Sequence, residues 1–497
     1  MSVIYFMPKI AGKFLACFTG ALFFVMPQST VAPVPAVDVP PVKVKNRVTD
    51  VEWQERAPRT PEMLAGFTPR AFPEPDWNQW GSRSDRKVRA SGFFRVEKQG
   101  DRWWLVDPDG NLNIHVGVAG VSPGSTSTNQ AALREVFGTP EKWAAQTTKQ
   151  LRDLRFNAAG AWSNVPHLRG TTGKDRLVYT VIGNAGAPGG GTGGFASSFG
   201  KKMRVTRPGV GHTTFPNGCI PIFHPDFPAF CDEFARPLAG LKDDKYLLGY
   251  FSDNELPGPR LEKYLALAPD DPVMGSSYRA AKDWLEARKG KNATTAAITQ
   301  ADKDAWNEYA YDYYFALTTA ATRKYDPNHL CLGPRFYELE ERDKPGPFRA
   351  AGKYLDVLGV NLYFVWSPKP EDIAKWAKWA GKPIMITEWY AKGMDSGFPN
   401  TSGAGWTVPT QNDRGLFYQT FTLGLLESKA CVGWQWFKYM DNDPNDPNAE
   451  ASNRDSNKGM VTNQFTVYPA LVERMRSLNQ HVYGLTDYFD RKPTAKR

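Results

Sequence analysis

The sequence predicts an α/β fold of the (β/α)8 TIM barrel type. Eight short apolar, β-prone runs recur between residues 113 and 443, and segments with helical periodicity lie between them. Several of these runs end abruptly in polar residues, as strands do at the catalytic face of a barrel. A doubly wound open sheet is the alternative, but it needs a glycine-rich turn after the first strand, which is absent here.

The expected strands are rich in Val, Ile, Leu and aromatic residues, which suits strands buried on both faces of a parallel sheet. In chain order they are NIHVGVAGV (113–121), FNAAGAWSN (156–164), LVYTVIGN (177–184), YLLGYF (246–251), HLCLGPRFY (329–337), VLGVNLYFVW (357–366), PIMITEWYAKG (383–393) and CVGWQWFKYMDND (431–443). The expected helices cover 140–155, 225–240, 275–289, 301–325, 346–355, 370–380, 412–429 and 468–482.

An irregular insertion, residues 185–223, follows the third expected strand and contains the run AGAPGGGTGG. A glycine-rich run suggests phosphate binding, but this one lacks both the Gly-Lys-Ser/Thr ending of a P-loop and the GxGxxG spacing of a dinucleotide site. We therefore expect a mobile loop over a cleft.

Residues 1–36 are predicted to be a signal peptide. Lys9 and Lys13 precede an apolar run at 14–26, and small residues follow it. The run is shorter than the roughly 20 residues that a membrane-spanning helix needs. This predicts a secreted or periplasmic protein with no stable membrane insertion. The remaining chain divides into an extended N-terminal arm (37–92), a barrel that begins with a β-hairpin (93–490) and a C-terminal tail (491–497).

The composition argues against several classes of partner. The formal net charge is +9, but there is no long Lys/Arg run, so nucleic acid is a poor fit. Cys219, Cys231, Cys331 and Cys431 show no CxxC spacing, and we expect neither a metal site nor a cofactor. Cys219 and Cys231 could form a disulfide across a loop, whereas the other two lie in strand-like runs.

Two glutamates end strands on the expected catalytic face. Glu255 follows the fourth strand and Glu388 ends the seventh, about three strand-helix repeats later. Cleavage of a glycosidic bond requires two such carboxylates, because one must protonate the leaving oxygen while the other attacks the anomeric carbon or activates water. A gap of about 5 to 5.5 Å predicts retention of configuration, and one of roughly 6.5 to 9.5 Å predicts inversion. A structural ion pair is the alternative role for either residue.

Three segments around these glutamates resemble glycoside hydrolase family 50, the β-agarases, within the clan A retaining enzymes. They are LGYFSDNELP (248–257), ITEWYAKGMDSG (386–397) and YMDNDP followed by SNRDSNKGMV (452–461). The resemblance covers roughly residues 100 to 490. It implies that Glu255 is the acid/base, that Glu388 is the nucleophile and that Asn254 binds the sugar 2-hydroxyl. It also implies agarose or agaro-oligosaccharides as the substrate.

Further candidate residues lie at or near the ends of the expected strands. Tyr363 is placed to donate a hydrogen bond that keeps the nucleophile ionised. Aromatic rings pack against the apolar faces of sugars, although core packing is the alternative for each of them. The substrate-binding candidates are Asn254, Tyr363, Trp436, Trp389, Trp162, Asn164, Asn361 and Asp441.

For three more residues, and for Asp441, a purely structural role is the alternative. Arg335 ends the fifth strand, where it would contact substrate or pair with a carboxylate, and Asp253 is a candidate support for Glu255. His115 suits a core histidine. Asp441 lies in a run with acidic alternation, but the run lacks the Gly and terminal Glu of an EF-hand, so sugar binding is the preferred interpretation.

The sequence thus predicts a retaining glycoside hydrolase that cleaves β-linked galactan without a cofactor. Two alternatives remain open. One is a clan A hydrolase of another specificity, such as a β-galactosidase or a porphyran-type enzyme. The other is a non-catalytic carbohydrate-binding barrel, which would have no need of two opposed carboxylates.

Overall fold

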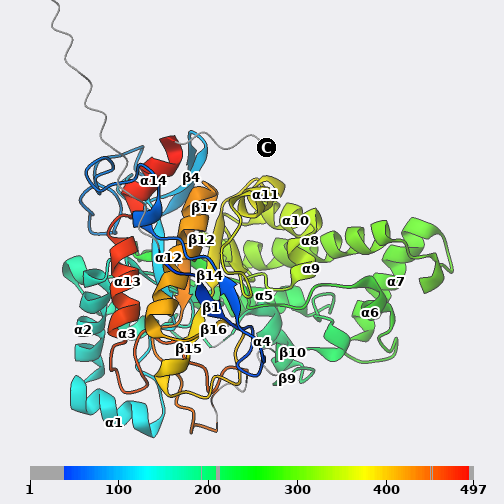
Figure 1. Cartoon of the computed structure of the whole chain (residues 1–497). Helices are drawn as coiled ribbons and strands as arrows, with labels where there is room; N and C mark the ends of the chain where they lie inside the picture. Colours follow the sequence, from blue (N-terminus) through cyan, green and yellow to red (C-terminus); the bar gives the residue numbers. More distant parts are fainter. Residues whose placement is uncertain (1–38, 192, 209–212, 448, 450–451, 492–497) are drawn as a thin grey trace, which may run out of the picture. The chain divides into compact units, whose positions relative to one another are not determined.

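The computed structural model describes residues 39–497 except 192, 209–212, 448, 450–451 and 492–497. The predicted signal peptide at 1–36 lies outside the described residues. The described chain contains an eight-stranded parallel sheet in the order β12-β11-β8-β7-β6-β17-β14-β13 (Figure 1). Its strands are β6 (His115–Ala119), β7 (Ala158–Ala159), β8 (Val178–Ile182), β11 (Leu247–Phe251), β12 (Leu330–Gly333), β13 (Leu358–Asn361), β14 (Ile384–Glu388) and β17 (Cys431–Phe437).

The sheet curls round on itself. Its two outer strands, β12 and β13, meet through a parallel bridge between Phe336 and Val360, just beyond the end of β12. All neighbouring strands are parallel, and each of the eight falls within a strand expected from the sequence. The predicted (β/α)8 barrel is therefore confirmed.

The strands form where the sequence has unbroken apolar runs. Every residue of β6, β8, β11, β14 and β17 is buried, as expected for a sheet covered by helices outside and filled by side chains inside. One core cluster combines strand residues such as Val178, Leu248, Leu332 and Met385 with Leu105 of the N-terminal hairpin.

The hairpin covers the amino-terminal end of the barrel. It consists of β3 (Arg95–Gln99), β4 (Arg102–Val106) and the short β5 (Leu112–Asn113), which form an antiparallel sheet. The Trp103 N–H donates to the carbonyl of Lys429, two residues before β17 begins. Because this end is covered, the opposite, carboxyl end carries the open mouth of the barrel.

Helices surround the strands (Figure 1). Several begin at a residue that caps the first turn. In α8, the Thr299 and Asp302 side chains each accept from the other's backbone N–H, and Thr410 and Asp413 do the same in α12. The helices are α1 (Ser127–Val136), α2 (Pro140–Asp153), α3 (Val165–Arg169), α4 (Phe195–Lys202), α5 (Phe227–Ala235), α6 (Leu261–Leu265), α7 (Gly275–Lys289), α8 (Gln300–Tyr325), α9 (Leu339–Arg342), α10 (Pro345–Tyr354), α11 (Pro370–Ala380), α12 (Gln411–Glu427), α13 (Pro469–Asn479) and α14 (Val482–Arg491).

The structure differs from the sequence-based expectations in several places, and the short helices α3, α6 and α9 are among the elements that were not expected. The insertion at 185–223 contains the eight-residue helix α4, so it is more ordered than the expected loop. The helix α1 was not expected, because its sequence is largely polar and it depends on a capping box at Thr126 and Asn129. The single helix expected at 468–482 is instead two helices, α13 and α14, which meet near Gln480.

Short strand pairs lie outside the barrel. In the arm, β1 (Val42–Val44) pairs with β2 (Gln54–Arg56), and Lys45 bridges to Thr407. The other pairs are β9 (Arg207–Pro208) with β10 (Thr213–Thr214), and β15 (Ala391–Gly393) with β16 (Trp406–Val408). Ion pairs also tie the arm to C-terminal helices, for example Arg83 to Asp487 at 2.9 Å.

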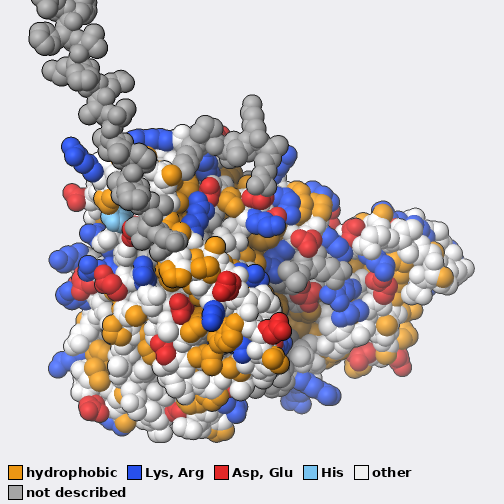
Figure 2. All heavy atoms as spheres, viewed as in Figure 1, with side chains coloured by type: hydrophobic (Ala, Val, Ile, Leu, Met, Phe, Trp, Pro, Cys, Tyr) orange, Lys and Arg blue, Asp and Glu red, His pale blue; other side chains and the backbone are white. Residues whose placement is uncertain are grey.

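The surface and the cysteines bear on the expected partners. Basic and acidic side chains are interspersed on the face seen in Figure 2, without one dominant patch of either sign. No helix of the described residues is long and apolar enough to cross a membrane.

A disulfide between Cys219 and Cys231 is not formed, since both are buried free thiols, and burial raises the pKa of Cys219 to about 12.

Candidate functional site

Glu255 and Glu388 both lie at the carboxyl end of the barrel. Glu388 is the last residue of β14, and Glu255 follows β11 after a short turn. Glu255 has a left-handed backbone with φ of 49°, an uncommon conformation for a residue with a side chain, and its N–H donates to the carbonyl of Pro334 at 2.9 Å. Only β12 and β13 separate the two carrier strands in the barrel.

Three side chains donate to the Glu388 carboxylate. The Arg335 guanidinium lies 2.7 Å from Oε1, and the Trp162 indole N–H donates to the same oxygen at 3.2 Å. The Tyr363 hydroxyl donates to Oε2 at 2.8 Å. Glu388 is only 6% exposed, so its charge depends on these donors rather than on water.

The electrostatics of Glu388 reflect two opposing influences. Burial raises its pKa above the ordinary value for a glutamate, and the neighbouring Glu255 carboxylate adds to that rise. Arg335, most of all, lowers the same pKa, with help from the Tyr363 hydroxyl and the Trp162 indole. The two carboxyl groups are therefore close enough to influence each other, and the donors favour the charged form of Glu388.

Asn361 connects the two glutamates. Its side-chain NH2 group donates to Glu255 Oε1 at 2.6 Å, and its side-chain oxygen Oδ1 accepts from the Thr387 hydroxyl at 2.6 Å. Asn361 is also the strand partner of Glu388 in the β13–β14 register. Asn361, a substrate-binding candidate from the sequence, thus contacts the Glu255 carboxylate and lies beside Glu388 in the sheet.

Arg335 is the other link. It lies fully buried after β12, with a left-handed backbone of φ 58°, and it donates to Asn254 Oδ1 at 2.8 Å and to the Thr387 carbonyl at 2.9 Å. The sequence left it open whether this arginine contacts substrate or a carboxylate, and the structure pairs it with Glu388. It also fixes the side chain of Asn254 beside the site.

Asp253 supports the site in a different way from the one expected. It is completely buried and accepts hydrogen bonds from the N–H groups of Ala196 and Ser197, and from the Ser197 and Tyr314 hydroxyls. A carboxylate at the first turn of α4 stabilises that helix terminus. Asp253 therefore ties the 185–223 insertion to the end of β11.

The predicted aromatic candidates fall into two groups. Trp162 is 45% exposed at the barrel mouth, and the Arg335 guanidinium lies 5.7 Å from the centre of its ring. Trp436 and Trp389 are fully buried and pack edge to face against each other, and Trp389 stacks on Phe421 at 4.0 Å. A ring without an exposed face cannot act as a sugar platform, so this structure does not support that role for Trp436 and Trp389.

Two other candidates have local structural contacts. Asn164 caps α3 by accepting from the N–H of His167. Asp441 is buried and accepts from the N–H groups of Lys458 and Gly459 at 2.8 and 2.7 Å, and from the Tyr468 hydroxyl at 2.8 Å. These contacts hold the 441–459 loop rather than presenting a free carboxylate.

Phe364 is a residue that the sequence analysis missed. It follows Tyr363 beyond β13, has a left-handed backbone with φ of 59° and is 45% exposed. Large exposed apolar side chains are few among the described residues, and Trp162 is another of them. The signal was present in the sequence, because Phe364 lies at a strand end next to a predicted site residue.

The chain has relatives among known proteins. No sequence-family model matches it. Two proteins from Vibrio sp. (strain JT0107) are similar to it in sequence. They are Beta-agarase B, 25% identical over 487 residues, and Beta-agarase A, 23% identical over 499 residues. These alignments cover 80% and 81% of this chain but 49% and 47% of the relatives. The chain thus spans about half the length of the curated relatives it matches.

Solved structures give a closer correspondence. The crystal structure of BpGH50 superposes with a TM-score of 0.76 at 27% identity, covering 93% of this chain and all of that one. The chain is thus similar in sequence and fold to a solved structure named as a GH50 protein, and similar in sequence to two β-agarases. A structure described as an exo-beta-agarase has a TM-score of 0.67 at 20% identity, over 83% of this chain and 68% of that chain, and it shares the barrel fold.

Proposed function

We propose that this protein is an exported retaining glycoside hydrolase that cleaves β-linked galactan, most specifically agarose or agaro-oligosaccharides. The observation that carries the proposal is the pair Glu255 and Glu388 at the barrel mouth, with three donors directed at one carboxylate. The names of the two relatives, Beta-agarase B and Beta-agarase A, support agarose as the substrate class.

Glu388 is assigned as the nucleophile. Its oxygens accept from Arg335, Tyr363 and Trp162, and such donors stabilise the ionised form that attack requires. A carboxylate oxygen would attack the anomeric carbon while the bond to the leaving oxygen breaks, giving a glycosyl ester. The Tyr363 and Trp162 donors hold the carboxylate in a fixed orientation for that attack.

Glu255 is assigned as the acid/base. In the first step its carboxyl group gives a proton to the leaving oxygen, and in the second it removes a proton from the water that cleaves the ester. Esterification removes the negative charge of Glu388 and with it the repulsion between the two carboxylates, so the same group can act as a base in the second step. Asn361 holds Glu255 in place through the bond to Oε1.

Trp162 and Phe364 are assigned as the two sides of the substrate slot. Trp162 follows β7 and Phe364 follows β13, and these strands lie on opposite sides of the eight-stranded ring. Exposed rings suit the apolar faces of pyranose sugars. Asn254, held by Arg335, is assigned to the 2-hydroxyl of the sugar between them.

Substitution of Trp162 should separate stacking from hydrogen bonding. Trp162→Ala removes both the ring and the N–H that donates to Glu388, and we expect kcat/KM on agaro-oligosaccharides to fall by about 100-fold. Trp162→Phe keeps a ring but no donor, and it should lose only about 10-fold, mainly in kcat. Equal losses in both variants would mean that the ring itself does not contact the sugar.

Substitution of Arg335 should change the pH dependence of activity. Arg335 lowers the pKa of Glu388, so Arg335→Met should raise that pKa and leave less of the nucleophile ionised at a given pH. The acid limb of the kcat/KM profile should then move upward by about one to three pH units. Arg335→Lys keeps a positive charge and should move the acid limb of the profile less. A lower rate with an unmoved profile would indicate a purely structural role.

The proposed activity is tested by incubating the protein with agarose, porphyran, carrageenan and mannan and sizing the products. Oligosaccharides should be released from agarose. If porphyran or small β-galactosides are the better substrates, the fold and mechanism stand and the specificity is another one. Binding of agarose without any hydrolysis would favour a non-catalytic barrel.

Proton NMR of the first-formed product should give the β-anomer, and an α-anomer would exclude a retaining mechanism.

A further inference from the structure

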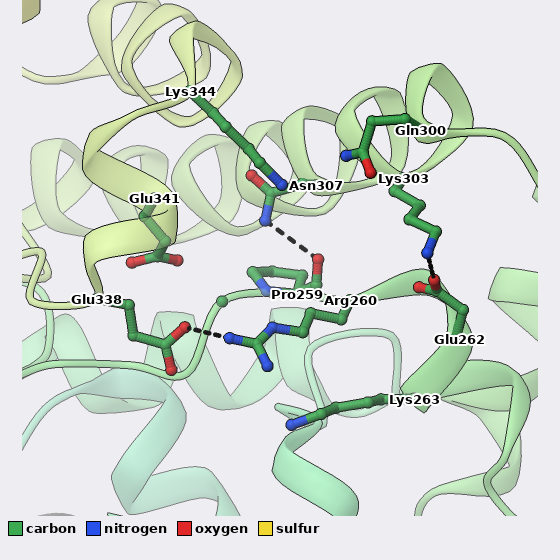
Figure 3. Close-up of a pocket in the computed structure, with 11 residues that line it drawn as sticks. Pro259, Arg260, Glu262, Lys263, Gln300, Lys303, Asn307, Glu338, Glu341 and Lys344 are labelled. Atoms are coloured by element: carbon green, nitrogen blue, oxygen red, sulfur yellow. Dashed lines mark hydrogen bonds and ion pairs between the residues drawn. The ribbon is translucent and has the colours of Figure 1, made fainter.

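A cavity of about 340 Å³ lies beside the barrel mouth, between α8, α9 and the segment that follows Glu255 (Figure 3). We call it the Glu341 cavity. Its size is within the range of small-ligand sites. It is lined by Gly258, Pro259, Arg260, Glu262, Lys263, Gln300, Lys303, Asn307, Glu338, Glu341 and Lys344.

Two buried polar atoms of this lining have no hydrogen-bond partner among the described residues. They are Oε2 of Glu341 and Oδ1 of Asn307, on side chains that are 3% and 8% exposed. The rest of each side chain is fixed. The Tyr311 hydroxyl donates to Glu341 Oε1, and the Asn307 amide donates to the Pro259 carbonyl at 3.1 Å. A buried polar group without a partner is destabilising, so these atoms indicate a missing ligand or water.

The cavity is adjacent to the catalytic residues through two segments of chain. Gly258 is three residues after Glu255, and Glu338 is three residues after Arg335. Between Arg335 and Glu338, the Tyr337 ring packs edge to face against Tyr363 at 6.1 Å, and Tyr363 bonds to Glu388. The cavity therefore lies on the Glu255 side of the site. That is where the leaving group must be, since Glu255 is assigned to protonate it.

The unpartnered atoms indicate what kind of group the cavity would hold. Burial raises the pKa of Glu341 to about 8, so near neutral pH its carboxyl is largely protonated and can donate. Asn307 Oδ1 can only accept. A hydroxyl group can accept from the protonated Glu341 carboxyl and donate to Asn307 Oδ1. A sulfate can only accept, and a metal ion needs an acceptor at every coordination position.

The charged residues of the lining are consistent with a neutral ligand. Arg260 pairs with Glu338 at 3.0 Å, and Lys303 pairs with Glu262 (Figure 3). Lys344 pairs with Asp304 at 3.2 Å. Lys263 is the remaining basic residue of the lining, and no ion pair of it is found among the described residues, so the cavity keeps a small positive excess. The paired charges still offer donors and acceptors to the hydroxyls of a sugar, and the experiment below includes a sulfated ligand to separate a neutral from an anionic occupant.

We propose that the Glu341 cavity is a remote subsite that binds a hydroxyl-bearing sugar residue of the galactan chain on the leaving-group side of the scissile bond. The inference rests on the proposed hydrolase function. In this arrangement Glu341 and Asn307 hold one sugar hydroxyl, and the chain reaches them past Gly258. Long substrates then gain affinity that short ones lack.

The test uses the full-length protein carrying Glu388→Gln, which holds substrate without cleaving it. Calorimetry is carried out with neutral agaro-oligosaccharides of increasing length, from the disaccharide upward. Affinity should rise by about 10-fold at the length that first reaches the cavity, as expected for one or two added hydrogen bonds. In the double variant with Glu341→Leu this step should disappear, whereas Glu341→Gln should keep most of it because an amide can still donate.

Controls make the outcomes distinguishable. Glu141→Leu makes the same replacement in a second cavity, of about 450 Å³, and should leave the step unchanged. Melting temperatures of all variants check folding. An unchanged step in Glu341→Leu would overturn the inference and leave the cavity to water, while the proposed function would stand. Failure of every oligosaccharide to bind would overturn both. A parallel series with sulfated galactan oligosaccharides, in which Lys344→Met causes the larger loss, would identify an anion site and contradict the neutral-sugar proposal.

Discussion

Glu388→Gln is expected to lower kcat on agaro-oligosaccharides by about 10⁴-fold or more. Glutamine has nearly the same shape, but only one of its two terminal atoms is an oxygen, so either Tyr363 on one side or Trp162 and Arg335 on the other keep their acceptor. The amide, however, is a very poor nucleophile and carries no charge to pair with Arg335. No glycosyl ester should form, and neither a burst of product nor a trapped intermediate should be detected by mass spectrometry.

The fold should survive this substitution. Burial of an ionised carboxylate is unfavourable by itself, so a neutral isostere removes part of that penalty while it leaves the Arg335 charge uncompensated. We expect the melting temperature to change by only a few degrees. Glu97→Gln, on the exposed hairpin strand β3, is the matched control and should retain full activity. Near-normal turnover in Glu388→Gln would remove Glu388 from the nucleophile role.

Much of the barrel could be predicted because its strands are the strongest signal in the sequence. A strand such as β11 or β17 is buried at every residue, which forces an uninterrupted apolar run that the sequence displays directly. Closure of the sheet could not be predicted in the same way. It depends on contacts between the segments of β12 and β13, such as the bridge from Phe336 to Val360 and the hydrogen bond from the Asp356 N–H to the Cys331 carbonyl, which no local pattern records.

The helices show the limit of local patterns. The polar helix α1 forms because Thr126 and Asn129 cap it, and its weak apolar face gave no periodic signal. The glycine-rich insertion looked like a loop for its whole length, yet Asp253 caps α4 within it from the end of a distant strand. Tertiary contacts of this kind override local propensity.

Within the site, the sequence located both glutamates and Asn361 but could not distinguish exposed rings from buried ones. Trp162 and Trp436 both lie near strand ends, and only the three-dimensional structure shows that one is half exposed and the other fully buried. The link from Arg335 to Glu388 was likewise one of two open options. The 2.7 Å ion pair in the structure decides between them, and the left-handed backbone of Arg335 is a conformation that the residue type does not predict.

Glu255→Ala is expected to reduce kcat/KM on agarose by about 10³- to 10⁴-fold, because no other group is assigned to protonate the leaving oxygen. A substrate with an acidic leaving group, such as a nitrophenyl glycoside, needs little protonation, so its first step should be far less affected. The second step still requires a base to activate water. The glycosyl ester on Glu388 should therefore accumulate, which a burst of nitrophenol would reveal.

Azide provides the deciding measurement for Glu255. It is a nucleophile that needs no base, and the space left by the missing carboxylate beside Asn361 would admit it. Added azide should restore turnover of the nitrophenyl substrate and give a β-glycosyl azide, since two inversions retain the configuration. Glu255→Gln keeps the group that faces Asn361 and fills that space, so it should respond much less. If neither variant were rescued and the nitrophenyl substrate lost as much rate as agarose, the proton donor would have to be another group.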